Sequence, residues 1–303
     1  MRFNRFARTF LVLAILLFVF PLQGKTEKKL SIYTVNYPLT YFAERIGGVY
    51  AEVIFPVPPG VDPAFWEPDD DTVRQYQKPD LIMLNGAGYA KWTRKVSLPM
   101  LRMVDTSRAF KEDLINIETN ITHTHGPGGD HSHGGTAFTT WLDFSQAAMQ
   151  AEAIYKALIR KIPSQKESFA KNFENLKGEL LELDKKMTEI GGRLAQAPLF
   201  ASHPIYQYLA RRYNMNIRMM MWEPDEDPGG NEWRHLQESM KEHPARWMIW
   251  EDEPLTTSVE KLKGMGISST VFAPYMNKPE AGDFMSVMRK NVENLQSVFS
   301  AEP

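Results

Sequence analysis

The longest regular pattern of apolar residues in the chain runs through residues 164–192. Apolar side chains recur there at alternating steps of four and three, separated mostly by Lys, Glu, Asp and Asn. That spacing predicts one long helix with a single apolar seam, about 40 Å in length at about 1.5 Å per residue. Ser164 can cap its first turn together with Glu167, and Gly191-Gly192 is typical of the left-handed turn that ends a helix. The seam consists of Phe169, Phe173, Leu176, Leu180, Leu183, Met187 and Ile190.

On both sides of this helix, short apolar runs alternate with amphipathic ones, which indicates strands alternating with helices. The expected strands are 28–35, 51–57, 80–85, 101–104, 199–202, 217–222, 247–250 and 269–272. The expected helices are 39–46, 70–77, 144–161, 205–213, 232–242, 258–263 and 283–299. Strand–helix–strand order of this kind predicts parallel sheets covered by helices.

We therefore predict an α/β fold of two lobes with parallel sheets, joined by one long rigid linking helix. The expected boundaries are 25–162 for the first lobe, 163–192 for the linking helix and 193–303 for the second lobe. A coiled-coil arm is the alternative for the long helix, but α/β patterns on both sides favour a connection between lobes. Ligands are expected in a cleft between the lobes, at the carboxyl ends of the strands.

The first 24 residues are typical of a secretory signal peptide. Arg2, Arg5 and Arg8 precede an apolar run of eleven residues at 10–20, which is too short to span a bilayer. Cleavage is expected near Gly24. The chain has no cysteine, so it has no disulfide, no thiolate metal ligand and no cysteine for a lipid anchor. We therefore expect a periplasmic monomer that is not lipidated.

Without the leader the chain has 32 basic and 37 acidic residues, which argues against nucleic acid as a partner.

Residues 117–137 form the one low-complexity segment, and we expect it to be a mobile surface loop. Four histidines lie among Gly, Thr and Ser, and such a loop could chelate Zn²⁺, Cu²⁺ or Ni²⁺ with modest affinity. A solvated loop without metal is the alternative. The four histidines are His123, His125, His131 and His133.

Several stretches, in their order along the chain, resemble the zinc- and manganese-binding solute-binding proteins of ABC importers, whose two lobes are joined by a rigid linking helix. The resemblance covers nearly all of the chain after the leader. It rests on PPGVDPAFWEP at 58–68, DLI at 80–82 with Asn85-Gly86, the His-rich loop, WLD at 141–143, Ser202-His203, YLARRY at 208–213 and MRKNV at 288–292.

The resemblance implies four metal ligands, of which this chain keeps one. The family's two N-terminal histidines fall on Ala64 and Thr139, its final aspartate falls on Pro274, and its third ligand falls on His203. One imidazole cannot hold Zn²⁺ or Mn²⁺ tightly, because a buried site needs about four N or O donors. Three interpretations stay open: other residues replace the missing ligands, the cleft holds another ligand, or it no longer binds metal.

A rebuilt site would draw on carboxylates near the expected cleft. Asp62 and Glu67 belong to the 58–68 stretch, and Glu223, Glu251 and Asp252 come just after strands of the second lobe. The candidate cleft ligands are therefore His203, Glu67, Glu223 and Glu251. The alternative is that these acids cap helices or pair with Arg211 and Arg212.

Two functions follow from these patterns. The first is a solute-binding protein that carries a divalent metal or a metal complex to an ABC importer permease in the inner membrane, with zinc as the first candidate and manganese or another divalent metal as alternatives. The second is a metal buffer or chaperone that binds through the His-rich loop. Catalysis is not expected, since Ser202 and His203 are adjacent and the chain has neither a glycine-rich phosphate loop nor an HExxH helix.

Overall fold

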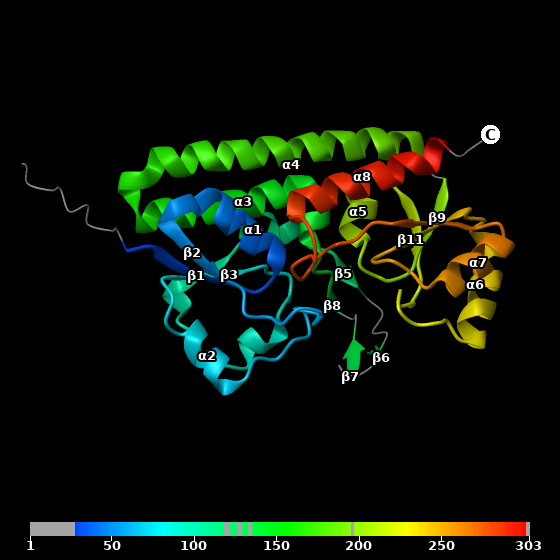
Figure 1. Cartoon of the computed structure of the whole chain (residues 1–303), viewed down its shortest axis with the longest axis horizontal. Coiled ribbons are helices and arrows are strands. Elements are labelled where there is room, and N and C mark those ends of the chain that lie inside the picture. The colour runs from blue at the N-terminus through cyan, green and yellow to red at the C-terminus, as the bar shows by residue number, and fades with distance from the viewer. Residues whose placement is uncertain (1–27, 118–121, 126–128, 133–134, 195–196, 301–303) are drawn as a thin grey trace, which may run out of the picture.

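Two parallel sheets form the framework of the molecule (Figure 1). The computed structural model describes residues 28–117, 122–125, 129–132, 135–194 and 197–300. The expected signal peptide lies outside these residues. Among the described residues, no helix has both the length and the apolar character of a membrane span.

The first sheet has four parallel strands in the order β2-β1-β3-β4. β3 is an interior strand, as expected from its apolar side chains on both faces. Asn36 caps α1 by accepting the Leu39 N–H, and its side chain also donates to Asn85 beyond β3. The elements are β1 (Leu30–Thr34), α1 (Tyr37–Gly47), β2 (Ala51–Ile54), α2 (Asp70–Tyr76), β3 (Leu81–Leu84), β4 (Met103–Asp105) and α3 (Phe144–Lys161).

The second sheet repeats this plan with four parallel strands in the order β10-β9-β11-β12. Its interior strands β9 and β11 are the most buried, which agrees with their apolar sequences. The elements are β9 (Pro198–Ala201), α5 (Gln207–Arg212), β10 (Asn216–Met219), α6 (Gly230–Glu242), β11 (Trp247–Trp250), α7 (Thr256–Gly264), β12 (Ser268–Val271) and α8 (Phe284–Ser300).

The long helix is α4 (Lys166–Leu194), which runs past both sheets along one side of the molecule (Figure 1). A 3-10 turn at Pro163–Gln165 leads into it. All seven residues of the predicted apolar seam are buried, and they pack against α1, α3 and α8. The predicted α/β fold, in which one long helix joins two parallel sheets, is confirmed.

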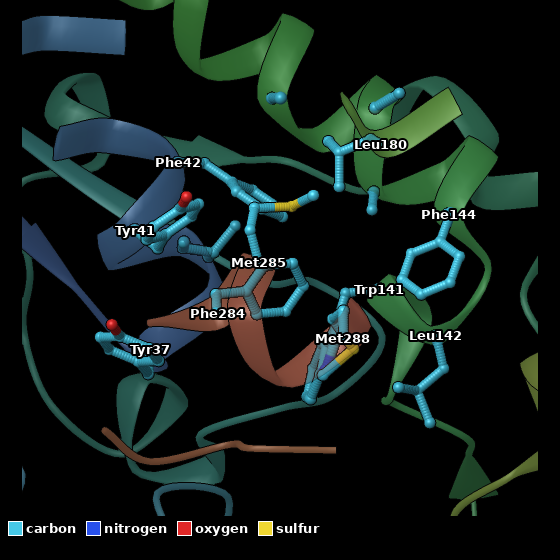
Figure 2. Packing of buried hydrophobic residues seen from close by; sticks show 14 of the residues in the cluster. Tyr37, Tyr41, Phe42, Trp141, Leu142, Phe144, Leu180, Phe284, Met285 and Met288 are labelled. Carbon is cyan, nitrogen blue, oxygen red and sulfur yellow. The ribbon is translucent and has the colours of Figure 1, made fainter. Parts of the chain in front are cut away.

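One apolar core connects the first half of the chain to the last helix. Figure 2 shows Tyr41 and Phe42 of α1 facing Phe284 and Met285 of α8. The Phe42 and Phe284 rings meet edge to face at 5.2 Å. The last helix, α8, thus packs against α1 and α4. The lobe boundaries expected at 162 and 193 stay a prediction.

The helix end predicted at Gly191-Gly192 is wrong, because α4 continues through both glycines to Leu194. Gly191 is buried, and a Cβ built on it would lie 2.0 Å from the carbonyl oxygen of Tyr213. Gly192 has no atom within 4 Å of such a Cβ. The first glycine therefore permits close packing between α4 and the end of α5, which a helix-end signal does not reveal.

These two neighbours provide a matched pair of substitutions. Gly191→Ala should lower the free energy of unfolding by about 1–3 kcal/mol or more, because the new methyl group forces α4 away from Tyr213. Gly192→Ala should raise it by up to about 1 kcal/mol through helix propensity. Urea unfolding of both variants measures the difference, and equal effects of the two substitutions would contradict this account.

The His-rich segment contains two short antiparallel pairings where a loop was expected. β5 (Asn116–Ile117) pairs with β8 (Gly135–Thr136), and β6 (Thr122–His125) pairs with β7 (Gly129–Ser132). The register places His123 opposite His131. Alternation of Thr and His is compatible with a two-stranded ribbon, which composition alone had not indicated. The expected mobility of this segment stays a prediction.

Candidate metal-binding site

Three adjacent strands of the second sheet end in potential metal ligands. His203 follows β9, Glu223 lies beyond β10 and Glu251 directly follows β11. Because β9 lies between β10 and β11, His203 is placed between the two glutamates. Parallel strands bring their carboxyl ends to one edge of a sheet, so residues far apart in the chain meet there.

The three side chains converge closely. His203 Nδ1 lies 2.9 Å from Glu223 Oε1 and 3.7 Å from Glu251 Oε1. One ligand atom from each residue lies within 4.8 Å of the other two, and no other His, Asp and Glu side chains meet in this way within the described part of the chain. The side chains are 6% exposed for His203, 21% for Glu223 and 14% for Glu251, so the group is largely shielded from bulk water. We call these residues the three-residue site.

The electrostatics of the site couple the imidazole to both carboxylates. Burial alone would lower the pKa of His203, but the charges of Glu251 and Glu223 raise it to about 9, helped by hydrogen bonds to Glu223 and to the Trp222 backbone. Burial raises the pKa of Glu251 to about 7, and His203 opposes that shift. In the absence of metal, a proton on His203 therefore balances part of the carboxylate charge, and a divalent cation can take the place of that proton.

Glu67 does not belong to this group. Its side chain is exposed and forms an ion pair with Lys95, which is also exposed. The prediction of Glu67 as a ligand is therefore not supported by the geometry. Its place in the 58–68 stretch suggested the site, but its carboxylate turns to the surface, where hydration favours a charged pair.

The positions where the resemblance predicts ligands have structural roles in this chain. Ala64 is buried, the Thr139 hydroxyl donates to the Ile205 carbonyl at 2.5 Å, and the Pro274 carbonyl accepts the Trp141 indole N–H at 2.9 Å. No metal donor is offered at positions 64 and 274, and the Thr139 hydroxyl is engaged with the backbone.

The structure describes no side chain of the four loop histidines. His123, His125 and His131 lie in β6 and β7, of which only the backbone is described, and His133 lies outside the described residues. Their expected role as metal ligands stays a prediction.

Sequence reasoning missed one buried polar side chain, that of Tyr89. The Tyr89 hydroxyl is buried, and no described residue forms a hydrogen bond with it. Burial and the charge of Asp62 raise the pKa of Tyr89 well above its usual value. Asp62 was considered together with Glu67 for a rebuilt site, and only Glu67 was chosen as a candidate ligand. No sequence pattern singles out Tyr89.

A comparison with protein families gives this geometry a context. Residues 32–298 match the family described as zinc-uptake complex component A, periplasmic (ZnuA). The chain belongs to this family. The match covers both sheets and α4, so the family assignment and the observed fold agree.

Individual relatives are distant but span most of the chain. The zinc-binding lipoprotein AdcA of Streptococcus pneumoniae (strain ATCC BAA-255 / R6) is 26% identical over 292 residues, which cover 92% of this chain and 58% of AdcA. The chain thus spans little more than half the length of this relative. The metal ABC transporter substrate-binding lipoprotein SloC of Streptococcus mutans is 24% identical, with 94% of each chain covered.

Solved structures show the same fold. The metal-dependent lipoprotein YcdH of Bacillus subtilis superposes with a TM-score of 0.75 at 20% identity, covering 89% of this chain and 98% of YcdH. Zn(II)-bound AdcA of S. pneumoniae superposes with a TM-score of 0.74 at 22% identity, covering 91% of this chain and 59% of AdcA. At these identities the likeness concerns the fold, and the ligand set must be argued from this chain's own residues.

Proposed function

We propose that this protein is a substrate-binding protein that holds a divalent metal ion, zinc first, at His203, Glu223 and Glu251 and delivers it to the permease of an ABC importer. The observation that carries this proposal is the convergence of the three ligand atoms within 4.8 Å at one edge of the second sheet. The family membership and the names of its zinc-binding relatives support the metal as cargo.

The donor set fits a first-row divalent ion. One imidazole and two carboxylates suit Zn²⁺ and also Mn²⁺, which accepts oxygen ligands readily. Burial of the group favours binding, since the charges of Glu223 and Glu251 are screened less by water. We infer binding and transfer without catalysis, because His203, Glu223 and Glu251 form a ligand set for a cation.

We propose a periplasmic, non-lipidated monomer. The Arg-rich start with its apolar run supports export, and the absence of cysteine from the 303-residue sequence supports the lack of a lipid anchor. AdcA of S. pneumoniae and SloC of S. mutans are named lipoproteins, so this chain would differ from them in how it is retained.

Titration with zinc and manganese tests the site against the His-rich segment. A variant with His123, His125, His131 and His133 all replaced by alanine should still bind one metal equivalent tightly, because the three-residue site is unchanged. Isothermal titration of wild type and variant in a competing chelator measures stoichiometry and affinity. Loss of the tight equivalent in the loop variant would overturn the proposal and favour a metal buffer that binds through the loop.

A further inference from the structure

A groove lies between the edge of the first sheet and one face of α3. Its volume is about 550 Å³, and its lining comes from the end of β3, from β4 with the residues on either side of it, and from α3. β4 is the last strand in the order β2-β1-β3-β4, so no described strand pairs with its outer edge. The groove shares no residue with the three-residue site, and the proposed function does not use it.

α3 presents one helical face to this groove. Other faces of α3 pack against α1 and against α4, beside which it lies in Figure 1. Met149, Ala153, Lys156 and Arg160 all line the groove, and their spacing of four, three and four residues places them on a single face. At about 1.5 Å per residue this stripe is about 17 Å long. Because Ala153 is small, a second helix of about three turns can pack closely along it.

The sheet side of the groove is apolar and partly open to solvent. Leu84, Met103 and Val104 line it and are only partly buried against the core. In the turn just before β4, Met100, which also lines the groove, is 83% exposed, and its neighbour Leu101 is fully exposed. Methionine side chains adapt their shape to a partner, and adjacent exposed apolar side chains indicate an interaction surface.

The charges around the groove favour an acidic partner. Two of its basic side chains, Arg108 and Arg160, are exposed and form no ion pair with any described residue. Its acids are already engaged, since Glu152 pairs with Lys156 at 2.8 Å and Asp105 accepts hydrogen bonds from the serine two residues on. The groove is thus basic on a chain whose formal net charge is −2. Carboxylates of a partner would complement the two arginines.

We propose that this groove docks an amphipathic, acidic helix of another protein. Its apolar side chains pack on the methionines and on Ala153, and carboxylates beside its apolar face pair with Arg108 and Arg160. A second copy of this chain fits less well, because a two-fold contact sets the same basic groove against itself. A small apolar ligand would leave both arginines without a partner. The inference goes beyond the proposed function and does not depend on bound metal.

Charge reversal tests the groove with two labelled synthetic peptides of about 14 residues, long enough to form a helix on binding. Both have a leucine face, flanked by glutamates in one and by lysines in the other. Fluorescence anisotropy should show that wild type binds the glutamate peptide about threefold to thirtyfold more tightly. The double variant Arg108→Glu with Arg160→Glu should prefer the lysine peptide. The matched control, Lys171→Glu with Lys185→Glu on exposed positions of α4, should keep the wild-type preference.

Filling the groove completes the test. Ala153→Trp should abolish binding of the glutamate peptide, and circular dichroism checks that the variant is folded. The proposal is overturned if wild type binds neither peptide or both alike, or if charge reversal leaves the preference unchanged. A wild-type dimer in sedimentation velocity that Ala153→Trp converts to monomer would assign the groove to a second copy and would also overturn it. None of these results bears on metal binding at His203, Glu223 and Glu251.

Discussion

Replacing His203 by alanine is expected to remove high-affinity metal binding. His203 is the single imidazole of the site and lies between Glu223 and Glu251, with its Nδ1 within 2.9 and 3.7 Å of their oxygens. Its loss leaves two partly buried carboxylates side by side without the cation that separates them, and their mutual repulsion favours protonation of one of them. The affinity for zinc should fall by about a thousandfold or more, which exceeds the 10–100-fold typical of losing an outer-shell partner.

His235→Ala is the matched control, because His235 lies exposed on α6. We expect this variant to bind zinc as wild type does. Isothermal titration with a competing chelator measures both affinities, and circular dichroism checks that His203→Ala remains folded. Tight binding by a folded His203→Ala protein would show that the ion is held elsewhere.

Much of this architecture can be predicted from the chain, because it depends on local patterns. The seam of α4 follows from its three- and four-residue spacing, and the two sheets follow from the alternation of apolar and amphipathic segments. His203, Glu223 and Glu251 could be named because each comes after a predicted strand of a parallel sheet. Strand ends are defined by sequence, and the topology then brings them to one edge.

The failures concern contacts that local sequence does not encode. Glu67 has the right chemistry and lies in the right segment, yet its side chain pairs with Lys95 at the surface. Gly191 has the sequence signature of a helix end, but a glycine is needed there because the Tyr213 carbonyl, just after α5, packs against it. Tyr89 is one buried aromatic among many, and it is distinguished by a hydroxyl that has no hydrogen-bond partner among the described residues.

The apparent affinity for zinc is expected to rise steeply with pH. The pKa of His203 is raised to about 9, so below that pH the metal must displace a proton from the imidazole. Affinity should increase about tenfold per pH unit between about pH 7 and 9, and more steeply below about pH 7, where Glu251 also takes up a proton. An ordinary histidine would give a plateau from about pH 7 upward.

The sign of the linked stability effect follows from the same shift. A pKa raised above 6.5 means that the folded metal-free protein holds this proton more tightly than the unfolded chain does. The resulting stabilisation is complete below about pH 6.5 and is lost as the pH rises through about 9. Zinc gains affinity over that same interval, so the increase in melting temperature on adding zinc should grow from pH 7 to 9.

Chelator competition and thermal unfolding at several pH values measure both trends. A zinc affinity independent of pH between 7 and 9 would contradict a proton held between His203 and its two glutamates.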